Sequence, residues 1–250
     1  MTDRRQTNKT GPSRLNRGLL QPFEAVLLQK LVRKLPAGVT PDMLTWLGLG
    51  GAALTGVGYF LTTWHEGFLW LASFGLLVNW FGDSLDGTLA RYRQIERPTY
   101  GFFVDHTTDI AAQLCIGLGL GLSPYVQLEI ALALMVTYLA ISCVAFIRKS
   151  VSGVLQISFY GNGPTEMRFM LIMVNMALFF LPIMTFGTDF GPLTLFDIGI
   201  MAICAGSLLL LAYMVNGERR ALALRDPSPL KRPAPLTPFP SAPSRPNRPR

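Results

Sequence analysis

The sequence predicts an all-α integral membrane protein, with six transmembrane helices and an N-terminal amphipathic helix at the membrane interface. Half of the residues are hydrophobic and only 15% are charged, against about 25% in typical soluble domains. The hydrophobic residues also gather in runs of about 20, the length that a helix needs to cross a bilayer. The composition therefore favours one bundle of membrane helices over a soluble fold.

The N-terminal region precedes the first apolar run. Residues 1–20 are polar and basic and are expected to form a disordered tail. Residues 21–35 are expected to form an amphipathic helix in the lipid headgroup layer. The alternative is an ordinary helix packed on the bundle. The expected apolar stripe holds Phe23, Val26, Leu27, Leu31 and Val32, opposite Gln29, Lys30, Arg33 and Lys34.

Residues 40–217 are expected to form the membrane domain. The predicted spans cover residues 43–64, 68–86, 102–122, 128–147, 167–186 and 193–215, and the second continues as a helix to Ala90. Residues 218–250 are basic and rich in proline and are expected to be a disordered tail.

The basic residues indicate how the chain crosses the membrane. All 22 lysines and arginines lie before the first span, after the sixth, or around the connections between the second and third and the fourth and fifth spans. Cytoplasmic loops carry the excess of basic residues. Both termini are therefore expected on the cytoplasmic side of a bacterial inner membrane or another cellular membrane. The net charge of +7 then reflects topology and anionic lipid headgroups, and no nucleic-acid partner is expected.

Four aspartates stand at the cytoplasmic ends of the second and third spans. Asp83 and Asp86 are three residues apart and Asp105 and Asp109 are four apart, so each pair shares one face of a helix. Carboxylates at a membrane edge are costly unless something balances them. A divalent cation would do so, and oxygen ligands favour Mg²⁺, Mn²⁺ or Ca²⁺. The alternative is that these acids only pair with arginines of the following loop.

The spacing around these acids resembles the signature of the CDP-alcohol phosphotransferase family, D-x2-D-G-x2-A-R followed by G-x3-D-x3-D. Here the signature runs from Asp83 to Arg91 and from Gly101 to Asp109, and the layout of spans extends the likeness to about residues 40–215. The loop between the two halves is one residue longer than the commonest family spacing. The resemblance implies a metal-dependent membrane enzyme of phospholipid biosynthesis. Such enzymes transfer a substituted phosphoryl group from a CDP-linked donor to an alcohol and release CMP.

The resemblance also implies roles for single residues. Asp83, Asp86 and Asp105 would be ligands of Mg²⁺ or Mn²⁺. Asp109 would be the catalytic base that takes the proton of the acceptor hydroxyl, and a further metal contact. The residues alone leave open which acid is the base. The residues expected at the CDP nucleotide are Gly87, Ala90, Arg91 and Gly101. The small residues let the donor come close, and an arginine suits a phosphate.

Two basic or polar groups near the acids carry weaker expectations. Arg148, Lys149 and Arg168 are expected to hold a phosphate of the acceptor or a lipid headgroup, or else only follow the positive-inside rule. His106 would touch substrate, because an Asp-His pair also stands in the aminoalcohol branch of the family, or would be an interfacial polar residue.

The remaining positions are expected to act in packing. Thr40-Pro41 together with Thr45 resembles the start of the family's first span. A helix cap is expected there, with nucleotide contact as the alternative. Gly117, Gly119 and Gly121 suit close packing or a homodimer seam. The polar residues expected to make hydrogen bonds between helices are Asn79, Gln113, Asn175 and Asp197.

Two subclasses of the family fit the sequence. In the favoured one, CDP-diacylglycerol donates a phosphatidyl group to a small alcohol such as glycerol phosphate or an inositol phosphate, as the basic residues after the fourth span indicate. In the other, a CDP-aminoalcohol donates to diacylglycerol, as the Asp-His pair indicates. A divalent-cation transporter or a non-catalytic membrane scaffold is the hypothesis from another class. A transporter would place its acids near the middle of the membrane, whereas these cluster at one edge.

Overall fold

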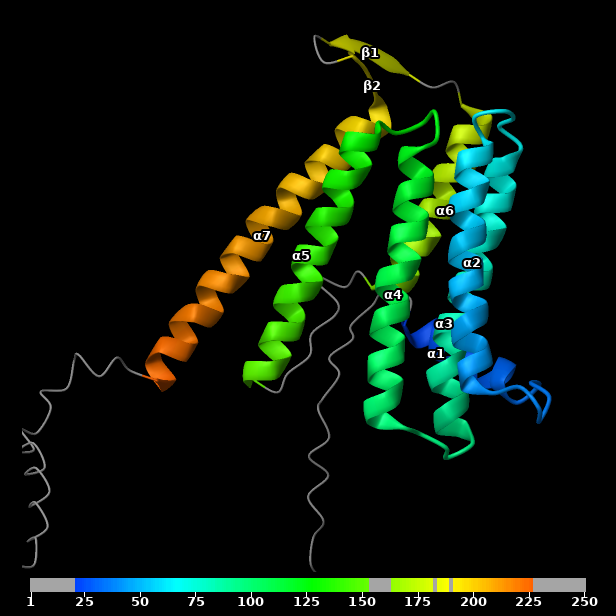
Figure 1. Ribbon diagram of the computed structural model, residues 1–250, viewed down its shortest axis with the longest axis vertical. Coiled ribbons are helices and arrows are strands. Elements are labelled where there is room, and N and C mark those ends of the chain that lie inside the picture. Colours follow the sequence, from blue (N-terminus) through cyan, green and yellow to red (C-terminus); the bar gives the residue numbers. More distant parts are fainter. Residues whose placement is uncertain (1–20, 153–162, 182–183, 189–190, 227–250) are drawn as a thin grey trace, which may run out of the picture. The chain divides into compact units, whose positions relative to one another are not determined.

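The computed structural model describes residues 21–152, 163–181, 184–188 and 191–226. Within them the helices are α1 (Gln21–Val32), α2 (Pro41–Leu61), α3 (Phe68–Tyr92), α4 (Pro98–Gly121), α5 (Leu128–Ser152), α6 (Pro164–Phe180) and α7 (Leu195–Arg225) (Figure 1). Strands β1 (Thr185–Thr188) and β2 (Gly191–Thr194) pair antiparallel as a hairpin between α6 and α7. The chain divides into two compact units, one up to Leu208 and one from Leu209, so α7 begins in the first and ends in the second.

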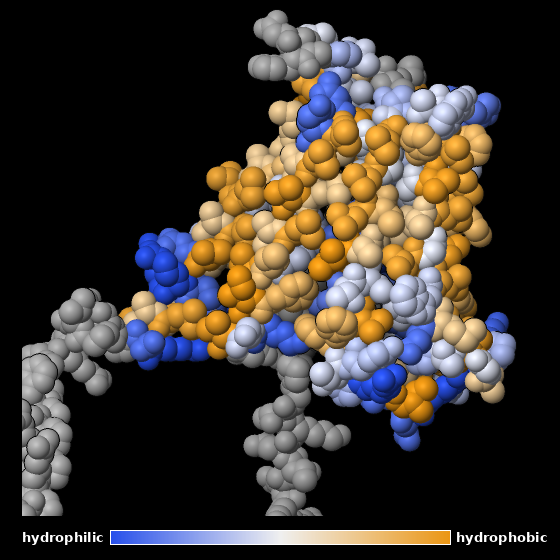
Figure 2. All heavy atoms as spheres, in the orientation of Figure 1, coloured by the Kyte–Doolittle hydropathy of each residue, from blue (hydrophilic) through white to orange (hydrophobic). Residues whose placement is uncertain are grey.

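Each of the six expected spans coincides with a helix, and apart from the hairpin the secondary structure of the described residues is all helical. Within the described residues, four helices are long and apolar enough to cross a membrane: α2, α3, α5 and α7. Six spans are therefore not confirmed. Helix α4 falls short because it carries Asp105, His106 and Asp109, and α6 has only 17 residues. Apolar side chains cover the middle of the helices of the first unit, and polar ones gather toward their ends (Figure 2).

Helix α6 ends earlier than the fifth predicted span. That span was expected to reach Phe186, but α6 ends at Phe180 and Phe186 lies in the hairpin. Pro182 explains the early end, because a proline disfavours helical geometry in the residue before it. The sixth predicted span, in contrast, is too short at its end. Helix α7 continues to Arg225, beyond residue 218, where the tail was expected to begin. Residues 218–225 are mainly good helix formers and contain no proline. The rest of that tail and residues 1–20 lie outside the described residues.

The first unit is organised around α2, which packs on both α3 and α4. Helices α2 and α3 approach closely because glycines face one another: a Cβ atom added at Gly51 would lie 2.8 Å from the carbonyl oxygen of Gly75. Gly119 of α4 meets Gly56 of α2 in the same way, and a Cβ at Gly121 would lie 2.8 Å from Ala131 Cβ in α5. The glycines of the third predicted span therefore serve close packing within the chain.

Helix α1 packs on α3 through one apolar face. Leu28 and Val32 are buried in a cluster with Leu44, Leu85 and Leu89 of the bundle. The residues of the expected apolar stripe are divided, because Val32 is buried against the bundle whereas Phe23, Val26 and Leu27 are exposed. The helix thus packs on the bundle, as the alternative interpretation held, and also presents apolar side chains outward. It ends at Val32 rather than at residue 35, since Pro36 follows.

Polar groups tie the helices inside the bundle. Tyr59 of α2 donates to Asn175 Oδ1 of α6 at 2.9 Å, and Asn175 Nδ2 donates to Ser73 Oγ of α3 at 3.0 Å. Asn79 Nδ2 donates to the carbonyl of Gly48 at 2.8 Å. The expected hydrogen bonds between helices are therefore confirmed for Asn79 and Asn175. Gln113 of α4 also hydrogen-bonds to the side chain of Tyr138 in α5, although its Oε1 is buried without a hydrogen-bond partner among the described residues.

Asp197, at the start of α7, is fully buried and holds two connections together. Its Oδ1 accepts from the backbone N–H of Gln127, just before α5, at 3.0 Å. Its Oδ2 accepts from the N–H of Thr194 at 2.9 Å, and Thr194 Oγ1 donates to the carbonyl of Tyr125 at 3.0 Å. The α4–α5 turn and the end of the hairpin are thereby joined through one carboxylate.

A single added methyl group at Gly51 is expected to destabilise the bundle. Backbone atoms of Gly75, Val78 and Asn79 leave no room for a Cβ there, so Gly51→Ala should lower the free energy of unfolding by about 1–3 kcal/mol. The neighbouring Gly50→Ala is the matched control, because a Cβ at Gly50 meets nothing within 4 Å. Unfolding of both variants in mixed detergent micelles measures the difference. Equal stabilities would contradict the close α2–α3 contact.

Candidate metal and phosphate site

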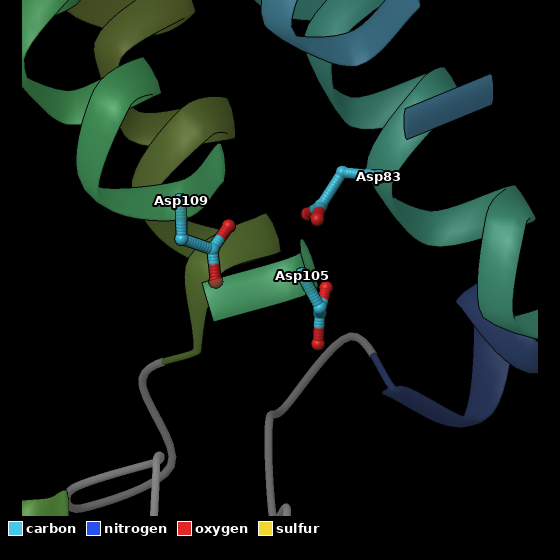
Figure 3. A group of neighbouring side chains, drawn as sticks. All are labelled: Asp83, Asp105 and Asp109. Atoms are coloured by element: carbon cyan, nitrogen blue, oxygen red, sulfur yellow. The ribbon is translucent and has the colours of Figure 1, made fainter. Parts of the chain in front are cut away.

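Three of the four predicted acids meet, one from the C-terminal half of α3 and two from the N-terminal half of α4. Asp83 of α3 and Asp105 and Asp109 of α4 offer carboxylate oxygens that all lie within 4.8 Å of one another (Figure 3). All three are partly buried. Both helices pack on α2, and a short connection joins the end of α3 to the start of α4. The spacing in the sequence and the packing on a common helix together place the acids side by side.

Asp86 lies next to this group but is turned toward α2. Thr45 Oγ1 donates to Asp86 Oδ2 at 2.6 Å, and the backbone N–H of Gly87 donates to Asp86 Oδ1. Asp86 is not part of the group of three that the structure brings within ligand distance. Its role as a metal ligand therefore remains a prediction. Thr40 is the cap that the sequence predicts, because its Oγ1 accepts from the N–H of Met43 at 3.2 Å.

A cation from a third helix reaches the acids. Arg168 of α6 places its Nη2 2.7 Å from Asp83 Oδ2, and its Nε donates to Asn79 Oδ1 at 2.6 Å. Only 12% of the Arg168 side chain is exposed, so both partners hold it inside the bundle. A charge-assisted pair of this kind is strong and directional. One guanidinium beside three carboxylates still leaves negative charge in excess.

The donor set fits a hard divalent cation. Carboxylate oxygens are the ligands that Mg²⁺ and Mn²⁺ prefer, and neither a cysteine nor a histidine belongs to the group. Asp83, Asp105 and Asp109 are the residues that would hold such an ion. A bound cation would also offset the mutual repulsion of these carboxylates.

The residues predicted at the nucleotide are spread over the ends of α3 and α4. Arg91 folds back along its own helix toward Gly87, and its Nη2 donates to Thr88 Oγ1 at 3.1 Å. Ala90 is half-buried, and Gly101 is exposed, where an added Cβ would meet nothing within 4 Å. Arg91 also lines a cavity of about 430 Å³ between α1 and α3; the other lining residues are Gln29, Val32, Arg33, Thr88 and Tyr92. The structure thus gathers the acids and Arg168, while Arg91 opens onto a neighbouring cavity.

His106 and Lys149 pack against phenylalanine rings beside the acids. The buried ring of His106 lies against Phe102 and Phe146, with centroids 4.0 Å and 5.2 Å away, and its Nδ1 is 3.4 Å from Asp105 Oδ2. Lys149 Nζ stands 2.9 Å from the centre of the Phe102 ring. Arg148 is half-buried at the same end of α5. Of the three predicted basic residues, Arg168 contacts the acid group through Asp83.

The sequence did not point to two residues that hold the site. Thr45 lies near the start of α2, yet it donates to Asp86, which lies 41 residues further along the chain. Glu24 accepts hydrogen bonds from residues 56, 60 and 141 positions away. No spacing within one sequence signals contacts of this separation.

An acidic site at the edge of apolar helices, with an arginine beside it, is typical of a membrane enzyme that handles phosphate groups. Residues 38–215 match the family model described as CDP-alcohol phosphatidyltransferase. The chain belongs to this family.

The sequence is also similar to that of one named protein. The chain is similar to the phosphatidylinositol phosphate synthase of Cutibacterium acnes (strain DSM 16379 / KPA171202), with 36% identity over 88 residues. The match covers 35% of this chain and 40% of the relative, so the chain spans less than half of that protein's length.

Removal of one carboxylate from the group is expected to weaken metal binding. Asp105→Asn should raise the dissociation constant for Mn²⁺ by at least about tenfold, the lower end of what even an outer-shell change costs. Asp42→Asn is the control, because Asp42 is an exposed acid near Arg97 at the start of α2. Titration of detergent-purified protein with Mn²⁺, followed by electron paramagnetic resonance, gives both constants. Equal affinity in the two variants would rule out this group as the cation site.

Proposed function

We propose that the protein transfers a phosphatidyl group from CDP-diacylglycerol to a small phosphorylated alcohol, such as an inositol phosphate or glycerol phosphate. The product would be a phospholipid precursor, and CMP would be released. The observation that carries the proposal is Arg168, a cation suited to phosphate that lies 2.7 Å from one acid of the group. The family and the name of the relative support the same reaction.

The bond changes of this reaction are simple. The acceptor hydroxyl oxygen bonds to the phosphorus that carries diacylglycerol. The bond from that phosphorus to the oxygen bridging the two phosphates breaks, and CMP leaves with the bridging oxygen. The hydroxyl proton passes to a base. In this proposal Asp109 is the base, because its carboxylate lies in the acid group but on the helix opposite the Asp83–Arg168 pair.

The other acids hold the charged donor in place. Asp83 and Asp105, with Asp86 as the further ligand, would bind Mg²⁺ or Mn²⁺. Such an ion, when bound, neutralises the diphosphate and polarises its phosphoryl oxygens. The small residues Gly87, Ala90 and Gly101 leave room for the nucleotide, and Arg91 would contact a phosphate from the end of α3. The donor's diacylglycerol chains would remain among the apolar helices.

Basic side chains would select the acceptor. Arg168 would hold the acceptor phosphate near Asp109, and Arg148 and Lys149 at the end of α5 would bind it from the other side. The distribution of basic residues supports a cytoplasmic position for this end of the bundle and for both termini. Soluble acceptors would reach the site from there.

The second candidate is transfer of a phosphoaminoalcohol from CDP-choline or CDP-ethanolamine to diacylglycerol. The Asp105–His106 pair favours it. Against it, His106 is buried between two phenylalanines, and neither of its ring nitrogens has a hydrogen-bond partner among the described residues. The favoured acceptor is therefore a small phosphorylated alcohol.

An assay with purified protein tests the proposed reaction. Radiolabelled CDP-diacylglycerol is expected to yield CMP and a new phospholipid with inositol phosphate or glycerol phosphate, only when Mg²⁺ or Mn²⁺ is added. Unphosphorylated inositol and glycerol are the matched acceptors. Product from CDP-choline and diacylglycerol instead would establish the second candidate. Absence of CMP from both donors would reject the transfer reaction altogether.

Loss of the Arg168 guanidinium is expected to affect the acceptor more than the donor. Arg168→Gln should raise the KM for the phosphorylated acceptor by about tenfold or more, because a charge-assisted hydrogen bond contributes about 1.5–3 kcal/mol. The KM for CDP-diacylglycerol should change much less. Arg97→Gln is the control, since Arg97 is exposed and lies 3.9 Å from Asp42. An equal rise in both KM values would place Arg168 at the donor instead.

A further inference from the structure

Glu24, in the first turn of α1, accepts three hydrogen bonds on one carboxylate oxygen. Its Oε1 lies 2.8 Å from Trp80 Nε1, 2.9 Å from Ser84 Oγ and 2.8 Å from Thr165 Oγ1. Trp80 and Ser84 belong to α3 and Thr165 belongs to α6, so one atom joins three helices. Glu24 is half-buried, and no lysine or arginine of the described residues pairs with it. Three neutral donors therefore stabilise its charge.

The donors stand beside the residues of the acid site. Ser84 directly follows Asp83, and Trp80 lies one helical turn before Ser84. Two contacts one turn apart fix how α3 is rotated about its axis, and with it the direction in which Asp83 points. Thr165 lies in the first turn of α6, three residues before Arg168. Glu24 thus holds the same ends of α3 and α6 that carry Asp83 and Arg168.

The direct link between these two helices is itself part of the site. Arg168 contacts Asp83 at 2.7 Å and Asn79 at 2.6 Å. A cation bound by Asp83, or a phosphate bound by Arg168, would compete with the ion pair. The Glu24 contacts use neither residue and would persist. They can therefore keep α3 and α6 in place while the charges at the site exchange partners.

We propose that Glu24 is a positioning residue, which sets the rotation of α3 and the approach of α6 so that Asp83 faces the acids of α4. Helix α1 then belongs to the working site as well as to the bundle surface. The geometric part of this inference concerns cation binding alone. Its effect on turnover rests on the proposed function.

Two substitutions of Glu24 separate hydrogen bonding from packing. Glu24→Ala removes all three contacts and should raise the dissociation constant for Mn²⁺ by about tenfold, with a matching fall in kcat, as for outer-shell partners in general. Glu24→Gln keeps an oxygen that accepts from the same donors and should stay within about threefold of the parent, which is less than the tenfold that loss of such a partner costs. Glu129→Ala, an exposed acid in the first turn of α5, is the matched control. Size-exclusion profiles and unfolding midpoints in detergent show whether each variant is folded.

Two further variants test the inference even if the Glu24→Ala protein fails to fold. Thr165→Val and Ser84→Ala each remove one donor and should each weaken Mn²⁺ binding in folded protein, while Thr185→Val in β1 should not. Unchanged Mn²⁺ affinity in every folded Glu24, Thr165 and Ser84 variant would overturn the inference. A shift in Mn²⁺ affinity without CMP release from either donor would support the positioning role and reject the proposed reaction. The two claims therefore fail separately.

Discussion

The close approach of α2 and α3 is the constraint on which the rest of the molecule depends. Glycines on both helices bring the two backbones together where no side chain would fit. Helix α4 then packs on the other side of α2, again through a glycine pair at Gly56 and Gly119. Because α3 and α4 share this partner, the acids that they carry converge. In a membrane, where apolar side chains gain little by leaving lipid, such close contacts supply much of the packing energy. The position of the acid group is therefore a consequence of small residues in the middle of the bundle.

The convergence of acids has an electrostatic cost that the chain meets with side chains from three further helices. Arg168 of α6 pairs with Asp83, Thr45 of α2 donates to Asp86, and Glu24 of α1 fixes the neighbouring turn of α3. Each of these partners satisfies or directs a carboxylate. The gathered carboxylates suit a divalent cation, and the buried guanidinium suits a phosphate. One site thereby combines carboxylates that suit a metal ion with a guanidinium that suits a phosphate group.

Much of this arrangement follows from the sequence, for physical reasons that also mark its limits. The spans are visible because lipid demands long apolar runs, and Asp83, Asp105 and Asp109 are visible because helical spacing puts acids on one face. The turn of Asp86 toward Thr45, the Glu24 contacts and the placement of Arg91 at a cavity beside α1 all depend on helix rotation. The rotation of a helix about its axis is decided by packing between residues far apart in the chain. No local periodicity in a single sequence reveals such packing. The hairpin between α6 and α7 was missed because its apolar residues extend the hydrophobic run of the fifth span.

The buried carboxylate of Asp197 has a consequence for the order in which the molecule is assembled. The backbone N–H of Gln127 and the carbonyl of Tyr125, at the turn between α4 and α5, find their partners only at Thr194 and Asp197. Ribosomes make those residues some seventy positions later. The turn between α4 and α5 therefore completes its hydrogen bonds only after the hairpin and the start of the last helix have emerged. Closure of that end of the bundle therefore waits for the synthesis of the hairpin and the first turn of α7.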